Sequence, residues 1–278
     1  MGTRAASLIA LCLAAHGIAE TRPGCEALPG AETLWSRPNL RFVLAGEMHG
    51  CAETPAIFRD LVCAASSSGR PVVVGLERRA SEQAALDAFM APANHKAATN
   101  ALLEQRGWNT FDGRSSRAML ALLEDLRVLK LSGRISEVVA FDARADGTDP
   151  QREQGMASAL IAAADRNANS LVLVLTGNLH ASKKLVEGFG AYPFMAMLLP
   201  AGQTVSLFVA DEGGEFWNCQ GGACCPHKQG ASGGTKRGLV LSRSAPLGFD
   251  GVLSTGLAAT ASPPAVEDGP PEPAGTKK

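Results

Sequence analysis

Four short segments of almost continuous apolar residues recur along the chain, at 40–46, 71–77, 137–143 and 171–177. They are rich in valine and leucine and lack the alternation of a strand that has one face in water. Strands of a parallel sheet are covered on both faces, so their sequences are apolar throughout. The pattern therefore predicts four buried strands that run parallel to one another.

Helical patterns separate these segments. Thr54 is predicted to cap a helix that has Pro55 at its first position, and Ser81 to cap a shorter one. Apolar residues at helical spacing predict longer helices over about 115–131 and 151–166. This alternation of strand and helix predicts an α/β fold with a mainly parallel central sheet flanked by helices.

A further strand pattern follows the fourth segment, after a predicted helix that ends near residue 189. Residues 204–210 are apolar, and residues 215–219 stand opposite them across the turn sequence DEGG. We expect the two segments to pair as an antiparallel hairpin at the edge of the sheet.

The patterned region predicts a single α/β domain over residues 20–244. Within it, residues 92–114 have a weaker pattern and predict an insertion that is helical at first and then a loop. Residues 245–278 are rich in proline, glycine, alanine and serine, a composition typical of a disordered tail.

Residues 1–19 have the pattern of a signal peptide, with Arg4, a short apolar run and small residues up to Ala19. This predicts a periplasmic or secreted protein, with a buried N-terminal helix as the alternative. No later stretch reaches the roughly 18 apolar residues of a membrane span, so no transmembrane anchor is expected.

An even number of cysteines remains after the predicted signal peptide, which favours disulfides in an exported protein. They are Cys25, Cys51, Cys63, Cys219, Cys224 and Cys225. The connectivity stays open, although Cys219 would close a short loop with either Cys224 or Cys225. With His227, the second cluster also allows a zinc knuckle.

Polar residues follow each of the four predicted strands at its carboxyl end. These are Glu47 and His49, Glu77 with Arg78, Asp142 with Arg144, and Asn178 with His180. Ligands of open parallel sheets bind beyond the carboxyl ends of the strands. The sequence therefore predicts that these side chains converge at one edge of the sheet.

Two of these strand ends share the pattern G-x-x-H, in GEMH and GNLH. Side chains two positions apart in an extended segment leave on the same face, so Glu47 and His49 are expected to point together, as are Asn178 and His180. The preceding glycines allow a turn or the close approach of a ligand.

Such a group of side chains suits the activation of water. An imidazole accepts a proton, a carboxylate orients it, and a second imidazole or an arginine stabilises the oxyanion. The same residues, Glu47, His49, Glu77 and His180, also match the ligands of a manganese, zinc or iron site. Spacing does not decide between the two. The HExxH motif, the Walker loop and the dinucleotide fingerprint are all absent from the sequence.

Arginines at the same edge are candidates for holding an anionic substrate group: Arg78, Arg144 and, in the insertion, Arg114, which with Trp108 and Asp112 would form a lid or pocket wall. Glu53 lies at a predicted helix start, where a carboxylate either meets the helix dipole or faces the substrate. With 26 basic and 27 acidic residues, the chain shows no charge bias toward nucleic acid. A small molecule or a peptide is the expected substrate.

The segments GEMHGCAE, GLE and GNLH resemble motifs of the superfamily that groups erythromycin-esterase-like proteins, ChaN-like haem-binding proteins and TraB/Tiki proteins. The resemblance covers about residues 40–210. It implies that Glu47 and His49 activate water or bind a metal, that Glu77 is the second acidic position, and that His180 is the late histidine. The single tyrosine, Tyr192, lies away from these motifs.

The branches of that superfamily differ in chemistry, among metal-independent ester hydrolysis, metal-dependent proteolysis and haem binding. Our first hypothesis is an exported hydrolase of ester or peptide bonds, with metal assistance left open. The alternative is a periplasmic haem- or metal-binding protein without turnover.

Overall fold

The computed structural model describes residues 24–143 and 149–266. The predicted signal peptide and Arg144 therefore lie outside the described residues. Among those described, no helix is long and apolar enough to cross a bilayer.

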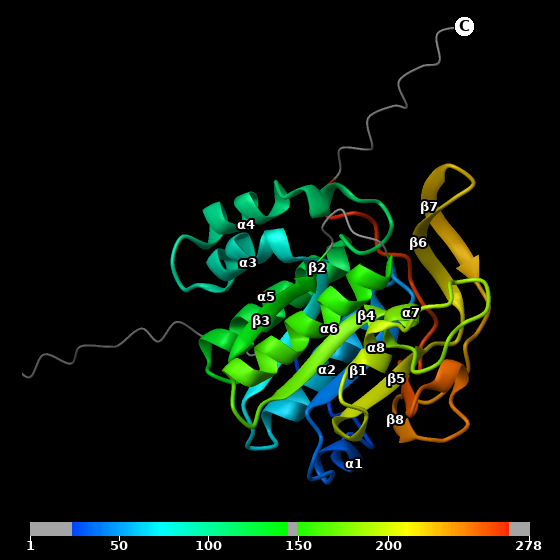
Figure 1. Ribbon diagram of the computed structural model, residues 1–278. Coiled ribbons are helices and arrows are strands. Elements are labelled where there is room, and N and C mark those ends of the chain that lie inside the picture. The colour runs from blue at the N-terminus through cyan, green and yellow to red at the C-terminus, as the bar shows by residue number, and fades with distance from the viewer. Residues whose placement is uncertain (1–23, 144–148, 267–278) are drawn as a thin grey trace, which may run out of the picture.

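A seven-stranded sheet forms the centre of the described chain, in the order β3-β2-β4-β1-β5-β9-β8 (Figure 1). Its strands are β1 (Phe42–Glu47), β2 (Val72–Arg79), β3 (Glu137–Asp142), β4 (Leu171–Gly177), β5 (Thr204–Ala210), β8 (Gly238–Leu241) and β9 (Gly251–Ser254). All neighbours pair in parallel except β8 and β9. The α/β prediction is confirmed.

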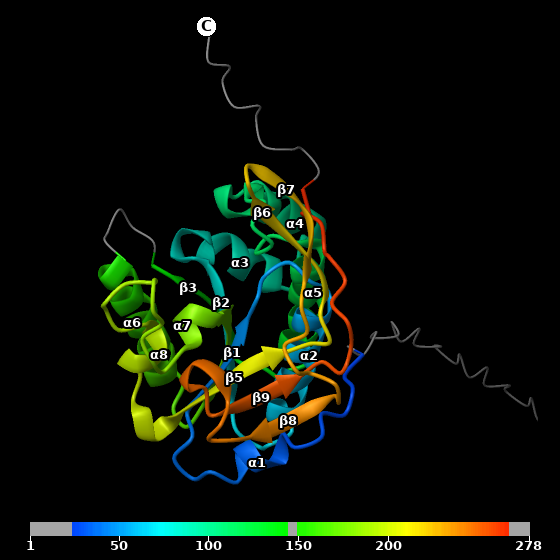
Figure 2. The ribbon, with the colours of Figure 1, turned by 90° about the vertical axis from the view of Figure 1, so that its right-hand side faces the viewer.

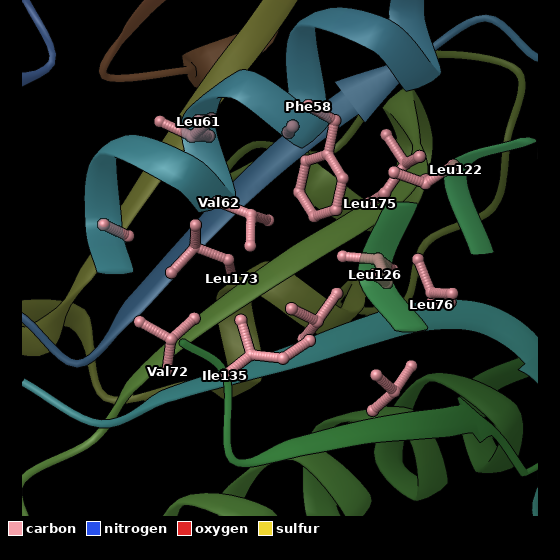
Figure 3. Packing of buried hydrophobic residues seen from close by; sticks show 14 of the residues in the cluster. Phe58, Leu61, Val62, Val72, Leu76, Leu122, Leu126, Ile135, Leu173 and Leu175 are labelled. Atoms are coloured by element: carbon pink, nitrogen blue, oxygen red, sulfur yellow. The ribbon is translucent and has the colours of Figure 1, made fainter. Parts of the chain in front are cut away.

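Helices cover both faces of this sheet (Figure 2). One face packs against α2 (Glu53–Ser66), α3 (Gln83–Met90) and α5 (Arg117–Leu131), and the other against α6 (Asp149–Arg166) and α8 (Met195–Leu198). Successive residues of each strand serve opposite faces, which is why the strands are apolar throughout. Figure 3 shows the first face, where Phe58 and Leu122 lie over Leu175.

Shorter elements complete the fold. They are α1 (Glu32–Trp35), α4 (His95–Leu103), α7 (Asn178–Ala181) and the 3₁₀ turns at Ala80–Glu82, Arg106–Asn109, Ala201–Gln203 and Pro246–Gly248. The predicted insertion thus contains α4, one 3₁₀ turn and a loop. The helix expected to begin at Pro55 begins two residues earlier, at Glu53, so Thr54 lies inside the helix and does not cap it.

The antiparallel hairpin exists, but its partners differ from the prediction. Residues 204–210 form β5, which pairs in parallel with β1 and β9, whereas β6 (Gly214–Gln220) pairs with β7 (Ala223–Gln229) in a separate two-stranded sheet. Gly213 and Gly214 have φ values of +80° and +121°, and this left-handed backbone turns the chain out of the main sheet.

The tail predicted to be disordered from residue 245 is also corrected. Residues 251–254 form β9 inside the main sheet, and Phe249 and Leu253 are buried. A strand of four residues is too short to stand out from the surrounding proline and glycine.

Two disulfides join described cysteines, Cys25 to Cys63 and Cys219 to Cys224. Cys51 and Cys225 are free thiols. The second pair is one of the two short-loop alternatives left open by the sequence.

Candidate active site

The first strand end brings a carboxylate and an imidazole into contact. Glu47 is the last residue of β1, and its Oε1 lies 3.0 Å from Nδ1 of His49. The carboxylate accepts this hydrogen bond, so Nδ1 carries the proton, and in the neutral imidazole Nε2 keeps its lone pair. Nε2 lies 3.8 Å from Oε2 of Glu77. His49 is therefore oriented as a proton acceptor.

Glu77, near the end of β2, is buried and fully hydrogen-bonded. Its Oε2 accepts from Oγ1 of Thr176 and the backbone N–H of Gly177, both at 2.8 Å. Its Oε1 accepts from Arg114 at 3.1 Å and Arg152 at 3.2 Å.

The surroundings of Glu77 keep it ionised. Burial raises the pKa of its carboxyl, but the charges of His49, His180 and Arg114 outweigh burial and hold that pKa far below its usual range. Glu77 anchors cations and does not donate protons.

Arg152, in the first turns of α6, connects three of the strand ends. Its Nε and Nη2 each donate to Asp142 at 2.9 Å, and its Nη1 lies 3.2 Å from Nε2 of His180. A guanidinium has only donors, so His180 Nε2 accepts. Nδ1 of His180 then donates to Oε1 of Glu153 at 2.6 Å, and the other Glu153 oxygen accepts from the Met195 N–H at 2.6 Å.

The two histidines are therefore not equivalent. His49 has a lone pair beside the cavity, whereas the lone pair of His180 is bonded to Arg152. The extended geometry predicted for Asn178 and His180 is also wrong, because Asn178–Ala181 is a short helix. On a helix, residues two apart do not share a face.

One open cavity of about 370 Å³ lies at this edge of the sheet. Its wall consists of Glu47, Met48, His49, Glu77, Asp112, Arg114, Arg152, Gly177, Asn178, Leu179 and His180. Arg114 donates to Asp112 and Glu77, so two of its five N–H groups have no partner among the described residues. Arg152 has one such N–H. The cavity thus combines a proton acceptor with available cationic donors.

Two other predicted substrate-binding residues lie elsewhere. Arg78 alternates with Glu77 along β2 and points away from the cavity, where it is buried, donates to Glu82 and Ser115, and stacks on Trp108 at 4.3 Å. Glu53 accepts a hydrogen bond from the backbone N–H of Thr260. Neither residue lines the cavity at the carboxyl end of the sheet.

Sequence reasoning missed Arg152 and Glu153. Both lie in the predicted helix that follows the third strand, at the end nearest the carboxyl edge of the sheet. A charged pair in the first turns of such a helix is the signal that points to them.

Cys51 lies close to His49 in sequence, but its surroundings disfavour the thiolate form that a nucleophile needs. Its thiol is buried next to Thr54, and burial raises its pKa to about 12.

The donor set does not fit a divalent cation. Among the described residues, no three His, Cys, Asp or Glu side chains are arranged to hold a metal ion. Oε1 of Glu77 accepts from two guanidiniums, Oε2 accepts from Thr176 and Gly177, and His180 Nε2 faces the guanidinium of Arg152. A cation placed there would meet like charge. For haem, His49 Nε2 is the one ring nitrogen of the two site histidines left to act as a ligand.

Several solved structures share the fold of this chain. Erythromycin esterase EreC superposes with a TM-score of 0.60 at 11% identity, over 85% of this chain and 94% of that one. The chain has the fold of this esterase. A protein from Bacillus cereus gives a TM-score of 0.57 at 11% identity, over 82% and 91% of the two chains.

A succinoglycan biosynthesis protein gives a TM-score of 0.56 at 10% identity, over 72% of this chain and 73% of that one. No protein-family model and no curated protein sequence matches the chain. The resemblance read from the motifs is confirmed at the level of the fold. Identities this low establish a fold and not an activity.

Proposed function

We propose that this protein is a hydrolase that cleaves esters in the cavity at the carboxyl end of the sheet, with His49 as general base and no metal ion. The observation that carries the proposal is the 3.0 Å Glu47–His49 pair, in a cavity that Arg114 and Arg152 also line. An esterase among the structures of the same fold supports it.

In the proposed reaction, His49 Nε2 takes a proton from a water molecule as the water oxygen attacks the ester carbonyl. Glu47 stabilises the imidazolium that forms. The N–H groups of Arg114 and Arg152 donate to the tetrahedral oxyanion. The imidazolium then returns the proton to the departing alkoxide, which completes acid and alcohol products.

Glu77 and His180 hold this machinery in place. Glu77 bonds both arginines and stays ionised, and the Glu153–His180 pair fixes the guanidinium of Arg152 from its other side. An ester suits this site better than a peptide bond, because an alkoxide departs with less proton transfer than an amine and His49 is the single proton carrier.

The walls of the cavity favour a substrate with an apolar group. Met48 and Leu179, the middle residues of the two G-x-x-H turns, both line the cavity, and Met48 is 43% exposed. An exposed methionine beside ionic groups offers an apolar contact to the part of the ester that does not react. The two disulfides support the proposal that the protein is exported, because disulfides persist in oxidising compartments.

The test is hydrolysis of p-nitrophenyl acetate, butyrate and hexanoate, with and without a chelator. We expect turnover that the chelator does not change, and a fall in kcat of at least about a hundredfold in His49→Ala. His95→Ala is the matched control, because His95 pairs with Glu124 and does not line the cavity.

An unchanged rate in His49→Ala would refute the assignment of the base. Loss of activity with the chelator would replace it by a metal mechanism. Absence of ester turnover, together with a Soret band on haem titration that disappears in His49→Ala, would instead favour the haem-binding alternative.

A further inference from the structure

The β6–β7 hairpin stands apart from the main sheet at the top of both views in Figures 1 and 2. Of its side chains, Phe216 is buried, against Cys51 and Ala259. A two-stranded hairpin with so little buried surface is marginally stable alone. The disulfide between Cys219 and Cys224 closes its tip.

The backbone of β6 is bonded directly to the loop that carries His49. The Trp217 N–H donates to the carbonyl oxygen of Gly50 at 2.9 Å. Gly50 has φ +99°, and a Cβ there would lie 2.0 Å from the Trp217 carbonyl oxygen. Strand and loop are in contact at a point where only glycine fits.

The loop that carries Arg114 meets them at the same point. A Cβ on Gly113 would lie 2.7 Å from Cα of Gly50 and 2.7 Å from the Trp217 carbonyl oxygen. Further along β6, Sγ of Cys219 lies 3.2 Å from the carbonyl oxygen of Phe111. The hairpin therefore contacts the loop of Arg114 at two places.

His49 precedes Gly50 and Arg114 follows Gly113, so the hairpin contacts the chain next to the proposed base and next to an oxyanion donor. Both of these side chains face Glu77: Nε2 of His49 lies 3.8 Å from its Oε2, and Nη1 of Arg114 lies 3.1 Å from its Oε1. We propose that the hairpin, closed by the Cys219–Cys224 disulfide, positions His49 and Arg114 against Glu77, and that a dithiol reductant lowers turnover by opening this disulfide.

The chemistry is a two-electron exchange. The dithiol transfers two electrons and two protons to the disulfide, which becomes the thiols of Cys219 and Cys224, while the dithiol closes to its own disulfide. Cys225 is a free thiol next to Cys224, with Sγ 3.5 Å from Nε2 of His227. A Cys225→Ser background removes disulfide exchange with this neighbouring thiol.

The inference rests on the proposed function for its kinetic test but has an independent readout. In Cys225→Ser, we expect dithiothreitol to speed amide hydrogen exchange of Trp217 at least about tenfold and to leave amides of β1 unchanged. Cys219→Ser/Cys224→Ser should show the fast exchange without reductant.

For hydrolysis, we expect kcat to fall about tenfold on reduction while KM changes less than twofold, because the loops orient reacting groups more than they bind substrate. The pH of half-maximal kcat/KM should also move toward the ordinary value of histidine as His49 separates from Glu77. Cys25→Ser/Cys63→Ser is the control. It lacks the other disulfide and should respond to reductant as the wild type does.

Unchanged Trp217 exchange on reduction would overturn the inference whether or not the protein hydrolyses esters. Fast exchange with unchanged kcat would overturn the positioning role. If the oxidised protein shows no ester turnover at all, the proposed function fails, and the exchange measurement still decides whether the disulfide holds the loop of His49.

Discussion

The two ends of the central sheet each contain a cavity and a pair of arginines, yet they differ in chemistry. At the amino end, a cavity of about 440 Å³ is larger than the 370 Å³ cavity at the carboxyl end. There Arg70 donates to the carbonyl oxygens of Leu40, Asn169 and Ser170, and Arg41 to that of Ala164. These arginines satisfy backbone groups where chain segments enter the sheet.

At the carboxyl end, the hydrogen bonds of the Arg114 and Arg152 guanidiniums go to side chains instead. Both donate to Glu77, and Arg152 also contacts His180. An arginine bound to backbone carbonyls stabilises the fold, whereas Arg114 and Arg152 are held by ionised side chains in the cavity where we propose that the substrate binds. The size of a cavity does not distinguish the two cases, but the partners of its charged groups do.

The largest effect is expected from Glu77→Gln, which removes the negative charge that binds Arg114 and Arg152 at the carboxyl end of the sheet. Two guanidiniums would lose a partner, so the free energy of unfolding should fall by about 3 kcal/mol, the low end for a broken buried ion pair. The value of kcat should fall about a thousandfold, because the base and the oxyanion donors lose their common anchor. Chemical denaturation and ester hydrolysis measure the two effects.

Wild-type stability in Glu77→Gln would contradict the anchoring role. Because the folded pKa of Glu77 is lowered, its contribution to stability is present above its unfolded pKa and is lost as the pH falls through the folded value. Glu77→Gln should therefore approach the wild type in stability at strongly acidic pH.

A direct comparison of the two ends comes from Arg152→Met and Arg70→Met. Arg152→Met should lower kcat/KM about a hundredfold, because it removes an oxyanion donor. Arg70→Met should lower the melting temperature with kcat/KM within about twofold of wild type, because three backbone carbonyls lose their donor. Equal loss of activity in both variants would erase the distinction between the ends.

The smallest expected effect is on the pH profile. Burial lowers the pKa of His49, but the carboxylates of Glu47 and Glu77 outweigh burial and raise that pKa above the ordinary value of histidine. A base works when neutral, so kcat/KM should rise up to about tenfold per pH unit below this raised pKa and level off above it. The stability from the His49 contacts has the opposite dependence: it is full below the unfolded pKa and is lost as the pH rises through the folded value.

Glu47→Gln should move this profile to lower pH, because it removes a charge that holds the proton on His49. A midpoint that stays in place would show that Glu47 does not set the pKa of the base.

The sequence by itself determined the parallel core and the edge at which chemistry collects. Apolar runs such as 171–177 must be covered on both faces, and polar residues after four such runs must meet at the carboxyl end. Glu47, His49, Glu77 and His180 all line the cavity for this reason. This part was predictable because it depends on local pattern and on a general rule of sheet topology.

Tertiary structure alone decided which partner each charged group meets. His49 and His180 have matching sequence contexts, but Arg152 is bonded to one and not to the other. Arg78 and Arg114 were equal candidates, yet the alternation of β2 turns Arg78 onto Trp108 and away from the cavity. Glu77 lies 75 residues from Arg152 and 37 from Arg114 in the sequence, so no local pattern specifies these hydrogen bonds.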